Sequence, residues 1–169
     1  YIRPFGTLSH AQFRAPGPLA LGSAAYAVDV EEVRIMSGAT STQRTAEQTE
    51  VARFHTENPN VFWSRNLRQF ATSQPTLAEN ARLAAMLWTA HSDGISGCFD
   101  SKYHYNFWRP TSAIQLADND GNPATTADPA WTPVVPPPNH PEYPAAHGCG
   151  GGAVIETLRD YYGTKKLKF

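Results

Sequence analysis

Two permanent cations, Lys102 and Arg109, stand seven residues apart in the stretch KYHYNFWRP, which is otherwise rich in aromatic rings. Cations in apolar surroundings need an anionic partner. That partner is either a surface carboxylate or a bound oxyanion, which Lys and Arg hold through charge-assisted hydrogen bonds. Taken alone, the spacing favours the first alternative, with a solvated Lys102 and a salt-bridged Arg109.

A histidine, His147, comes shortly before the glycine run 150–152 and a predicted helix. Backbone N–H groups at a helix start attract anions, and a histidine beside them can transfer a proton or act as a nucleophile. The alternative is a loop histidine followed by glycines that only make the chain flexible. His104 and His140 have no such setting, and His140 with His147 lacks a third ligand at metal-binding spacing. We therefore predict no metal site built from protein side chains.

Composition and charge describe one globular domain covering residues 1–169, with 41% hydrophobic residues. The net charge of −1 provides no global field for binding nucleic acid or anionic lipid. No apolar run approaches the roughly 20 residues needed to cross a bilayer. Cys98 and Cys149 could form one disulfide, but free or half-buried thiols are the favoured interpretation. The isolated carboxylates are expected to cap or pair rather than catalyse; these are Asp93, Asp100 and Glu142.

Helical periodicity and capping signals predict an all-α fold that positions these residues. Helices are expected at 23–37, 45–57, 77–100 and 152–162, with further helical segments from Ser64 and near Pro110. Ser23 is a predicted N-cap, and the stretches TAEQ and TLAE have the capping-box pattern. The apolar helix 77–100 should be central to a bundle, and its pattern can continue through Lys102.

A long proline-rich loop is predicted at 118–144, where eight prolines exclude a continuous helix. Its stretch DNDGN is typical of a turn, and a calcium loop is the weaker interpretation because the downstream Glu ligand is absent. Loops of this length inside a compact domain are usually functional.

The motifs resemble those of the superfamily of vanadium-dependent haloperoxidases and type 2 phosphatidic acid phosphatases, in its haloperoxidase-like bacterial and plant branch. The first motif of that superfamily is a Lys, six residues and Arg-Pro, which matches Lys102, Arg109 and Pro110. The second is Pro-Ser-Gly-His, which lies at YPAAH with Pro144 and His147 retained. Stretches such as RTAEQTEVARF, LAENARLAAML and DNDGNPATTADPAWTP extend the resemblance over nearly the whole chain.

The resemblance implies an all-α helical bundle whose site holds vanadate or a phosphoryl group, with phosphate or sulfate as mimics of vanadate. Lys102 and Arg109 would donate hydrogen bonds to the oxyanion, and His147 would be the catalytic acid–base group. The backbone N–H of Ala146 would stand where the superfamily has its motif glycine. Ala145 and Ala146 replace the motif Ser and Gly, so one hydroxyl donor is missing and the turn is less free.

The third motif of the superfamily carries another Arg and the His that bonds vanadium or attacks phosphorus, and it would lie beyond Phe169. We therefore expect this chain to be the central part of a longer haloperoxidase-like protein, and to be inactive in isolation. In the complete enzyme, vanadate would activate hydrogen peroxide for halide oxidation, whereas phosphate in the same pocket would imply hydrolysis of phosphomonoesters. The rival interpretation is a non-enzymatic helical homologue that only binds phosphate.

The expected partners are therefore small molecules: peroxide and halide, or a phosphate ester. No nucleic acid and no membrane span are expected, whereas a homodimer or a missing complementary segment would fit an incomplete site. The resemblance favours a secreted or periplasmic location.

Overall fold

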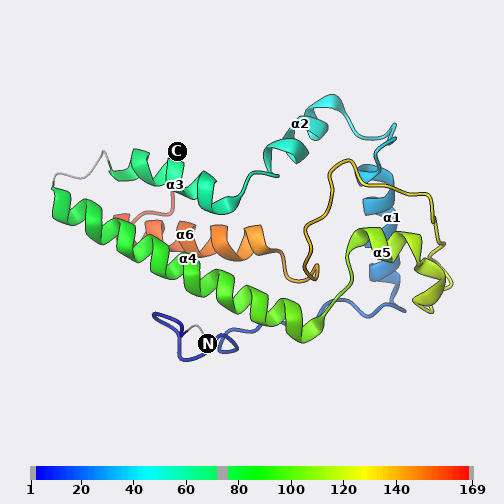
Figure 1. The fold of residues 1–169 in the computed structure, drawn as a ribbon, viewed down its shortest axis with the longest axis horizontal. Coiled ribbons are helices and arrows are strands. Elements are labelled where there is room, and N and C mark those ends of the chain that lie inside the picture. Colours follow the sequence, from blue (N-terminus) through cyan, green and yellow to red (C-terminus); the bar gives the residue numbers. More distant parts are fainter. Residues whose placement is uncertain (1–2, 72–75, 168–169) are drawn as a thin grey trace. The chain divides into compact units, whose positions relative to one another are not determined.

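A computed structural model of the chain describes residues 3–71 and 76–167 (Figure 1). The described chain is helical, with α1 (Ala24–Ser37), α2 (Ala46–Phe54), α3 (Pro59–Ala71), α4 (Leu77–Tyr105), α5 (Pro110–Gln115), the 3₁₀ helix η1 (Ala117–Asn119) and α6 (Ala146–Tyr162). The all-α prediction is confirmed. Within the described ranges, no helix has both the length and the apolar character that a membrane crossing requires.

The chain divides into two compact units, which we describe separately. Unit 1 comprises residues 1–15, 57–104 and 144–169, and unit 2 comprises residues 16–56 and 105–143. Residues 1, 2, 168 and 169 at the two ends lie outside the described residues. The prediction of one domain over 1–169 stays a prediction.

Unit 1 buries an apolar core supplied by α3, α4 and α6, whose green and orange ribbons run beside one another in Figure 1. Leu83 of α4 and Leu158 of α6 are fully enclosed, and burying a leucine side chain contributes about 1.5–3 kcal/mol. The other buried members of this core are Trp63, Phe70, Leu87 and Val154. Leu83 and Leu87 lie on one stripe of α4, and this stripe is the face that α4 turns to the core.

Two glycines allow α4 and α6 to approach each other closely. A Cβ atom on Gly150 of α6 would lie 2.9 Å from His91 Nε2, and one on Gly94 of α4 would lie 2.9 Å from the Cβ atom of Ala153. Both distances are well below van der Waals contact between carbon and its neighbours. Hydrogen atoms are therefore the only substituents that fit at these two positions without a shift of the helices or of the side chains that they meet.

The start of α6 corrects our prediction. The helix begins at Ala146, six residues before the predicted start near Gly152, and the glycine run lies inside it. Glycine lowers helix stability by about 1 kcal/mol per residue, which is why the run was interpreted as a break. Close packing against α4 outweighs that preference, so Gly150 serves the helix contact and not a loop.

Alanine substitutions in this run should therefore have opposite effects. In Gly150→Ala the new methyl group meets His91 and Ile95, so we expect the free energy of unfolding to fall by about 1–3 kcal/mol. In Gly152→Ala the new methyl group meets nothing within 4 Å, so the gain in helix preference should raise it by about 0.5–1 kcal/mol. Urea denaturation of the two variants checks this, and equal effects would contradict the packing role of Gly150.

The boundary between α2 and α3 also differs from the prediction. Helix α2 ends at Phe54 instead of residue 57, and α3 begins at Pro59 instead of Ser64. The Asn58 side chain accepts a hydrogen bond from the Asn60 N–H at 2.9 Å, and Pro59 occupies the first helical position. The Asn-Pro pair, which lies between the two predicted helices, is the start of the second one.

The predicted N-caps are confirmed, and one of the two predicted capping boxes is complete. The Ser23 hydroxyl accepts from the Tyr26 N–H at 3.1 Å, and Thr45 with Gln48 makes both hydrogen bonds of a capping box. At the start of α4, the Thr76 hydroxyl accepts from the Glu79 N–H at 3.2 Å and donates to the Glu79 carboxylate at 2.6 Å.

In unit 2, hydrogen bonds fix the long loop to α1 and to the residues just before that helix. The indole N–H of Trp131 donates to the Arg34 carbonyl at 2.9 Å, and the Asn122 amide donates to the Leu21 carbonyl at 2.8 Å. Apart from η1 and an isolated bridge between Gly38 and Pro133, the loop is irregular, as predicted. It is therefore ordered by side chains, and it covers α1 and α5.

Candidate functional site

The predicted site residues are divided between the two units. Unit 1 holds Lys102, Ala145, Ala146 and His147, whereas Arg109 lies in unit 2. Helix α4 ends at Tyr105, and Asn106 follows with a positive φ of 46°, a conformation that commonly ends helices. Lys102 and Arg109 therefore do not share a helix, and each is described within its own unit.

Lys102 is enclosed in unit 1. Its side chain is only 1% exposed, which makes it the largest of the fully buried side chains in the described residues. Removing an ammonium group from water is strongly unfavourable unless charge or hydrogen-bond acceptors compensate it. The alternative of a solvated Lys102 is therefore wrong, and a buried cation stands at the first position of the first motif.

The start of α6 offers backbone donors without a side-chain cap. Ala145 is the N-cap residue and has no side chain that could accept a hydrogen bond, and the first helical bond runs from the Cys149 N–H to the Ala145 carbonyl at 3.0 Å. The N–H groups of the preceding first turn have no acceptor within the helix. His147 lies in that turn and is exposed to solvent. Uncapped N–H groups with the positive end of the helix dipole suit an anion.

A disulfide joins these two parts of unit 1. Cys98 of α4 is bonded to Cys149 of α6, with their Cα atoms 6.1 Å apart. Cys98 precedes Lys102 by one helical turn, and Cys149 follows His147 by two residues. Our interpretation of free thiols is wrong because the glycine contact brings the two helices within bonding distance. The disulfide fixes the Lys102 end of α4 against the first turn of α6.

Arg109 is the N-cap residue of α5 in unit 2, and it forms an ion pair there. Its Nη1 atom lies 2.6 Å from Glu142 Oε2, and its side chain is 23% exposed. Its buried Nε atom has no hydrogen bond within the part of the chain that the structure describes. The salt-bridged alternative for Arg109 is confirmed, as is the expectation that Glu142 pairs. Any oxyanion at Arg109 would share the guanidinium with this carboxylate.

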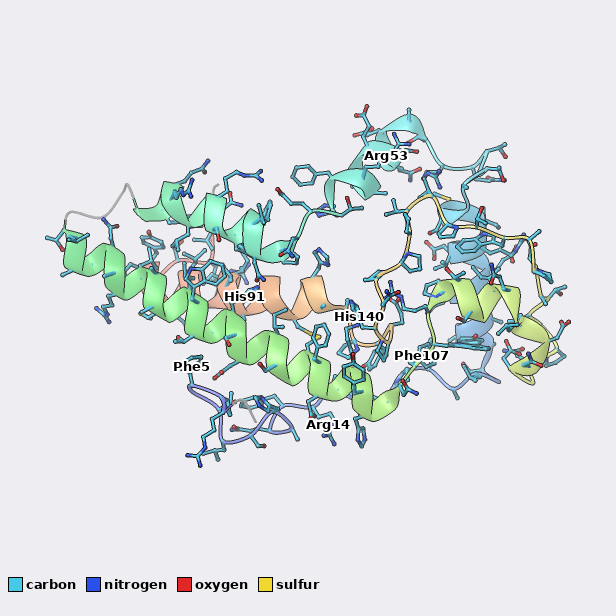
Figure 2. The ribbon with its side chains drawn as sticks, in the orientation of Figure 1. Phe5, Arg14, Arg53, His91, Phe107 and His140 are labelled. Carbon is cyan, nitrogen blue, oxygen red and sulfur yellow. A yellow bond between two sulfur atoms is a disulfide. The ribbon has the colours of Figure 1, made fainter. Side chains whose placement is uncertain are left out.

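The two remaining isolated carboxylates, Asp93 and Asp100, bind the first residues of unit 1 to α4. Asp93 accepts three backbone N–H groups, from residues 5, 6 and 7, at 2.8, 2.6 and 3.2 Å. Partial burial acts to raise the pKa of Asp93, but these donors outweigh it and lower the pKa below its usual value. Asp100 pairs with Arg14 at 2.6 Å, and Figure 2 shows Phe5 and Arg14 on this segment beside α4. Capping and pairing are as predicted.

A buried histidine, His91, was missed from the sequence. Figure 2 labels it on α4. It is 4% exposed, its ring meets Trp88 edge-on at 5.5 Å between centroids, and burial lowers its pKa. Its Nε2 atom has no hydrogen bond among the described residues and lies at Gly150. Its position four residues after Leu87, on the apolar stripe, is the signal that could have identified it. It is a neutral packing residue of the contact between α4 and α6.

The donors found suit an anion and not a metal cation. A buried ammonium and uncapped N–H groups are what vanadate or phosphate would require. Over residues 3–71 and 76–167, no three His, Cys, Asp or Glu side chains gather closely enough to hold a metal ion.

Comparison with known proteins identifies relatives of this chain. A family model described as the VCPO second helical-bundle domain matches residues 82–169, slightly more than half of the chain. The chain is also 33% identical over 102 residues to a vanadium chloroperoxidase from Curvularia inaequalis, a match that covers 54% of this chain. The same match covers 16% of that relative's length, so it spans a small part of the relative.

Proposed function

Because the chain belongs to the vanadium-dependent haloperoxidase superfamily, we propose that it supplies oxyanion-binding residues to an enzyme that oxidises halide with hydrogen peroxide. One observation carries the proposal. The lysine of the first motif, Lys102, is 1% exposed. Such burial fits a lysine that binds an anion better than a lysine that is hydrated at the surface. The matched region includes both Lys102 and His147.

Each residue would have a distinct part in this function. Lys102 would donate hydrogen bonds from its ammonium group and offset the negative charge of the oxyanion. The N–H groups at the start of α6, at Ala146 and its neighbours, would add donors along the helix dipole. His147 would give a proton to, or take one from, an oxygen of the bound group. Vanadate, when bound, would supply the activation of peroxide for the two-electron oxidation of halide.

Arg109, in unit 2, would donate to an oxyanion only in competition with Glu142. The ion pair at 2.6 Å occupies one guanidinium nitrogen, and the carboxylate repels an approaching anion. We expect Glu142→Gln to strengthen oxyanion binding for this reason.

The same ion pair, together with alanine at 145 and 146, favours the second candidate function, a homologue that binds phosphate without catalysis. Hydrolysis of phosphomonoesters would use the same donors, so activity assays are needed to distinguish this function from halide oxidation.

The test compares two reactions in the complete source protein. Bromide oxidation with added vanadate and peroxide is measured beside hydrolysis of a phosphomonoester, for the wild type and for His147→Ala. We expect vanadate-dependent bromide oxidation that falls at least a hundredfold in the variant, because a lost catalytic acid–base group costs about 10²–10⁴-fold. His55→Ala, which changes an exposed histidine of unit 2, is the control and should keep full activity.

The 169-residue chain alone is measured in the same two assays. We expect it to bind vanadate or phosphate weakly and to turn over neither substrate, since it carries the first two motifs only. Ester hydrolysis without bromide oxidation by the complete protein would replace the proposal by the phosphatase alternative. Anion binding with neither activity would leave the non-enzymatic homologue.

A further inference from the structure

Unit 2 contains an apolar cavity whose lining includes none of the proposed oxyanion donors. Its volume is about 290 Å³, and it is bounded by α1, by α5 and by the residues just before α5. Val30 and Val33 of α1 line one side, and Ala113 and Ile114 of α5 line another. A cavity of this size has room for roughly ten water molecules at about 30 Å³ each, or for one aromatic ring with a short chain.

Aromatic rings form much of the cavity wall. Tyr26, Phe107, Trp108 and Tyr143 all line it, and Figure 2 labels Phe107 at the chain segment that leads into α5. Tyr26 is 3% exposed, and its ring meets Phe107 edge-on at 6.3 Å between centroids. Tyr143 is held by a hydrogen bond from its hydroxyl to the Pro16 carbonyl at 2.5 Å. These contacts hold the rings in place, and the negative face of an aromatic ring attracts a cation.

The charged residues that line the cavity are both acidic. They are Asp29 of α1 and Glu142, and no Lys or Arg side chain lines this cavity of unit 2. Glu142 is already neutralised by Arg109 at 2.6 Å. Asp29 is exposed to solvent and makes no ion pair within the described residues. One uncompensated carboxylate thus lies at the border of an aromatic cavity.

We propose that this cavity binds a small apolar molecule that carries a single positively charged amine. The apolar part would occupy the space between the aromatic rings, where it leaves water, and the ammonium group would lie at the Asp29 carboxylate. An anion of the same size would be repelled by Asp29, and a neutral molecule would gain only the burial of its apolar part. The cavity therefore selects a charge opposite to the one that the oxyanion site selects.

Three probes of nearly equal size test the charge preference. These are 2-phenylethylamine, the neutral 2-phenylethanol and the anion 3-phenylpropionate, titrated into the complete source protein and into the 169-residue chain by calorimetry. For a ligand of about nine heavy atoms we expect a Kd of ~0.1–1 mM for the amine. The alcohol should bind about threefold to tenfold more weakly, and the anion should show no binding in the millimolar range.

Variants locate the site. Asp29→Asn should weaken amine binding about threefold to fivefold and leave alcohol binding unchanged, because an exposed charge contributes modestly. Glu32→Gln is the matched control, since Glu32 is an exposed carboxylate on the same helix that does not line the cavity, and it should change nothing. Val33→Phe and Val30→Phe should each fill the cavity and abolish binding of both molecules, with circular dichroism showing whether each variant is folded.

Nuclear magnetic resonance of the chain gives a second readout. The amine should shift the amide resonances of Ala113 and Ile114, which line the cavity, and leave those of the unit 1 core, such as Leu83, in place. Equal affinity for amine and alcohol, an unchanged affinity in Asp29→Asn, or shifts confined to unit 1 would each overturn the proposal. Binding to the isolated chain but not to the complete protein would also overturn it, because another segment would then fill the cavity.

Discussion

Replacing both Cys98 and Cys149 by serine should lower the free energy of unfolding of unit 1 by about 4 kcal/mol. The disulfide closes a loop between residues 51 apart, and removing such a link frees the unfolded chain to adopt many more conformations. The loop-entropy relation gives about 4 kcal/mol for this length. Guanidinium denaturation followed by the fluorescence of the unit 1 tryptophans, Trp63 and Trp88, measures the change.

A reductant provides the control for this experiment. The wild type treated with a phosphine reductant should unfold at the same denaturant concentration as the double serine variant, and the variant itself should not respond to the reductant. If reduced and oxidised wild type unfold together, the two cysteines are not bonded in the protein, and the connection between α4 and α6 depends on the glycine contact alone.

Lys102→Met should weaken phosphate or vanadate binding to the chain by about 10- to 100-fold. The ammonium group is enclosed, so a hydrogen bond that it gives to an anion is not screened by water, and hydrogen bonds to charged groups contribute about 1.5–3 kcal/mol. Methionine has nearly the same length and apolar volume, so the substitution removes the charge and leaves the packing. Calorimetric titration with phosphate and with vanadate measures the affinity.

Lys165→Met is the matched control, because Lys165 is an exposed lysine of the same unit. Its removal should change anion affinity less than twofold, since exposed charges contribute little at physiological salt. A thermal readout is independent of the titration: phosphate at a concentration that saturates the wild type should raise the Tm of the wild type and of the control, and should raise the Tm of Lys102→Met much less. Equal loss in both lysine variants would mean that the anion binds to surface charge and not to the motif.

Local signals in the sequence predicted most of the helices. Capping depends on neighbouring residues, so Ser23, Thr45 and Thr76 could be identified from three or four positions of sequence, and their hydrogen bonds are present. The beginning of α6 could not be predicted in this way. Whether glycine ends a helix or lies within one depends on a partner more than fifty residues away, such as His91 for Gly150.

The sequence marked the candidate residues, but their surroundings could not be predicted from it. Motif order and spacing marked Lys102, Arg109 and His147, whereas burial of Lys102 follows from tertiary packing that no periodicity reports. The partner of Arg109 is Glu142, more than thirty positions further along the chain, and the sequence indicates only that such a carboxylate should pair. Residue types thus predicted which charged groups could bind an anion. Which of these charges already have a partner within the protein depends on the fold.

The division into units has a consequence for how the chain folds during synthesis. The backbone passes between the two units four times, so each unit is assembled from segments far apart in the chain. The Phe5 N–H can form its hydrogen bond only after Asp93 has been synthesised, 88 residues later. The Pro16 carbonyl likewise requires Tyr143, 127 residues later. At about 5–20 residues per second, the ribosome takes roughly ten seconds to deliver these partners. Before α5 and α6 are synthesised, α1 lacks the cover of α5 and α4 lacks that of α6, so this protein should depend on chaperones during translation more than a helical bundle with sequential neighbours.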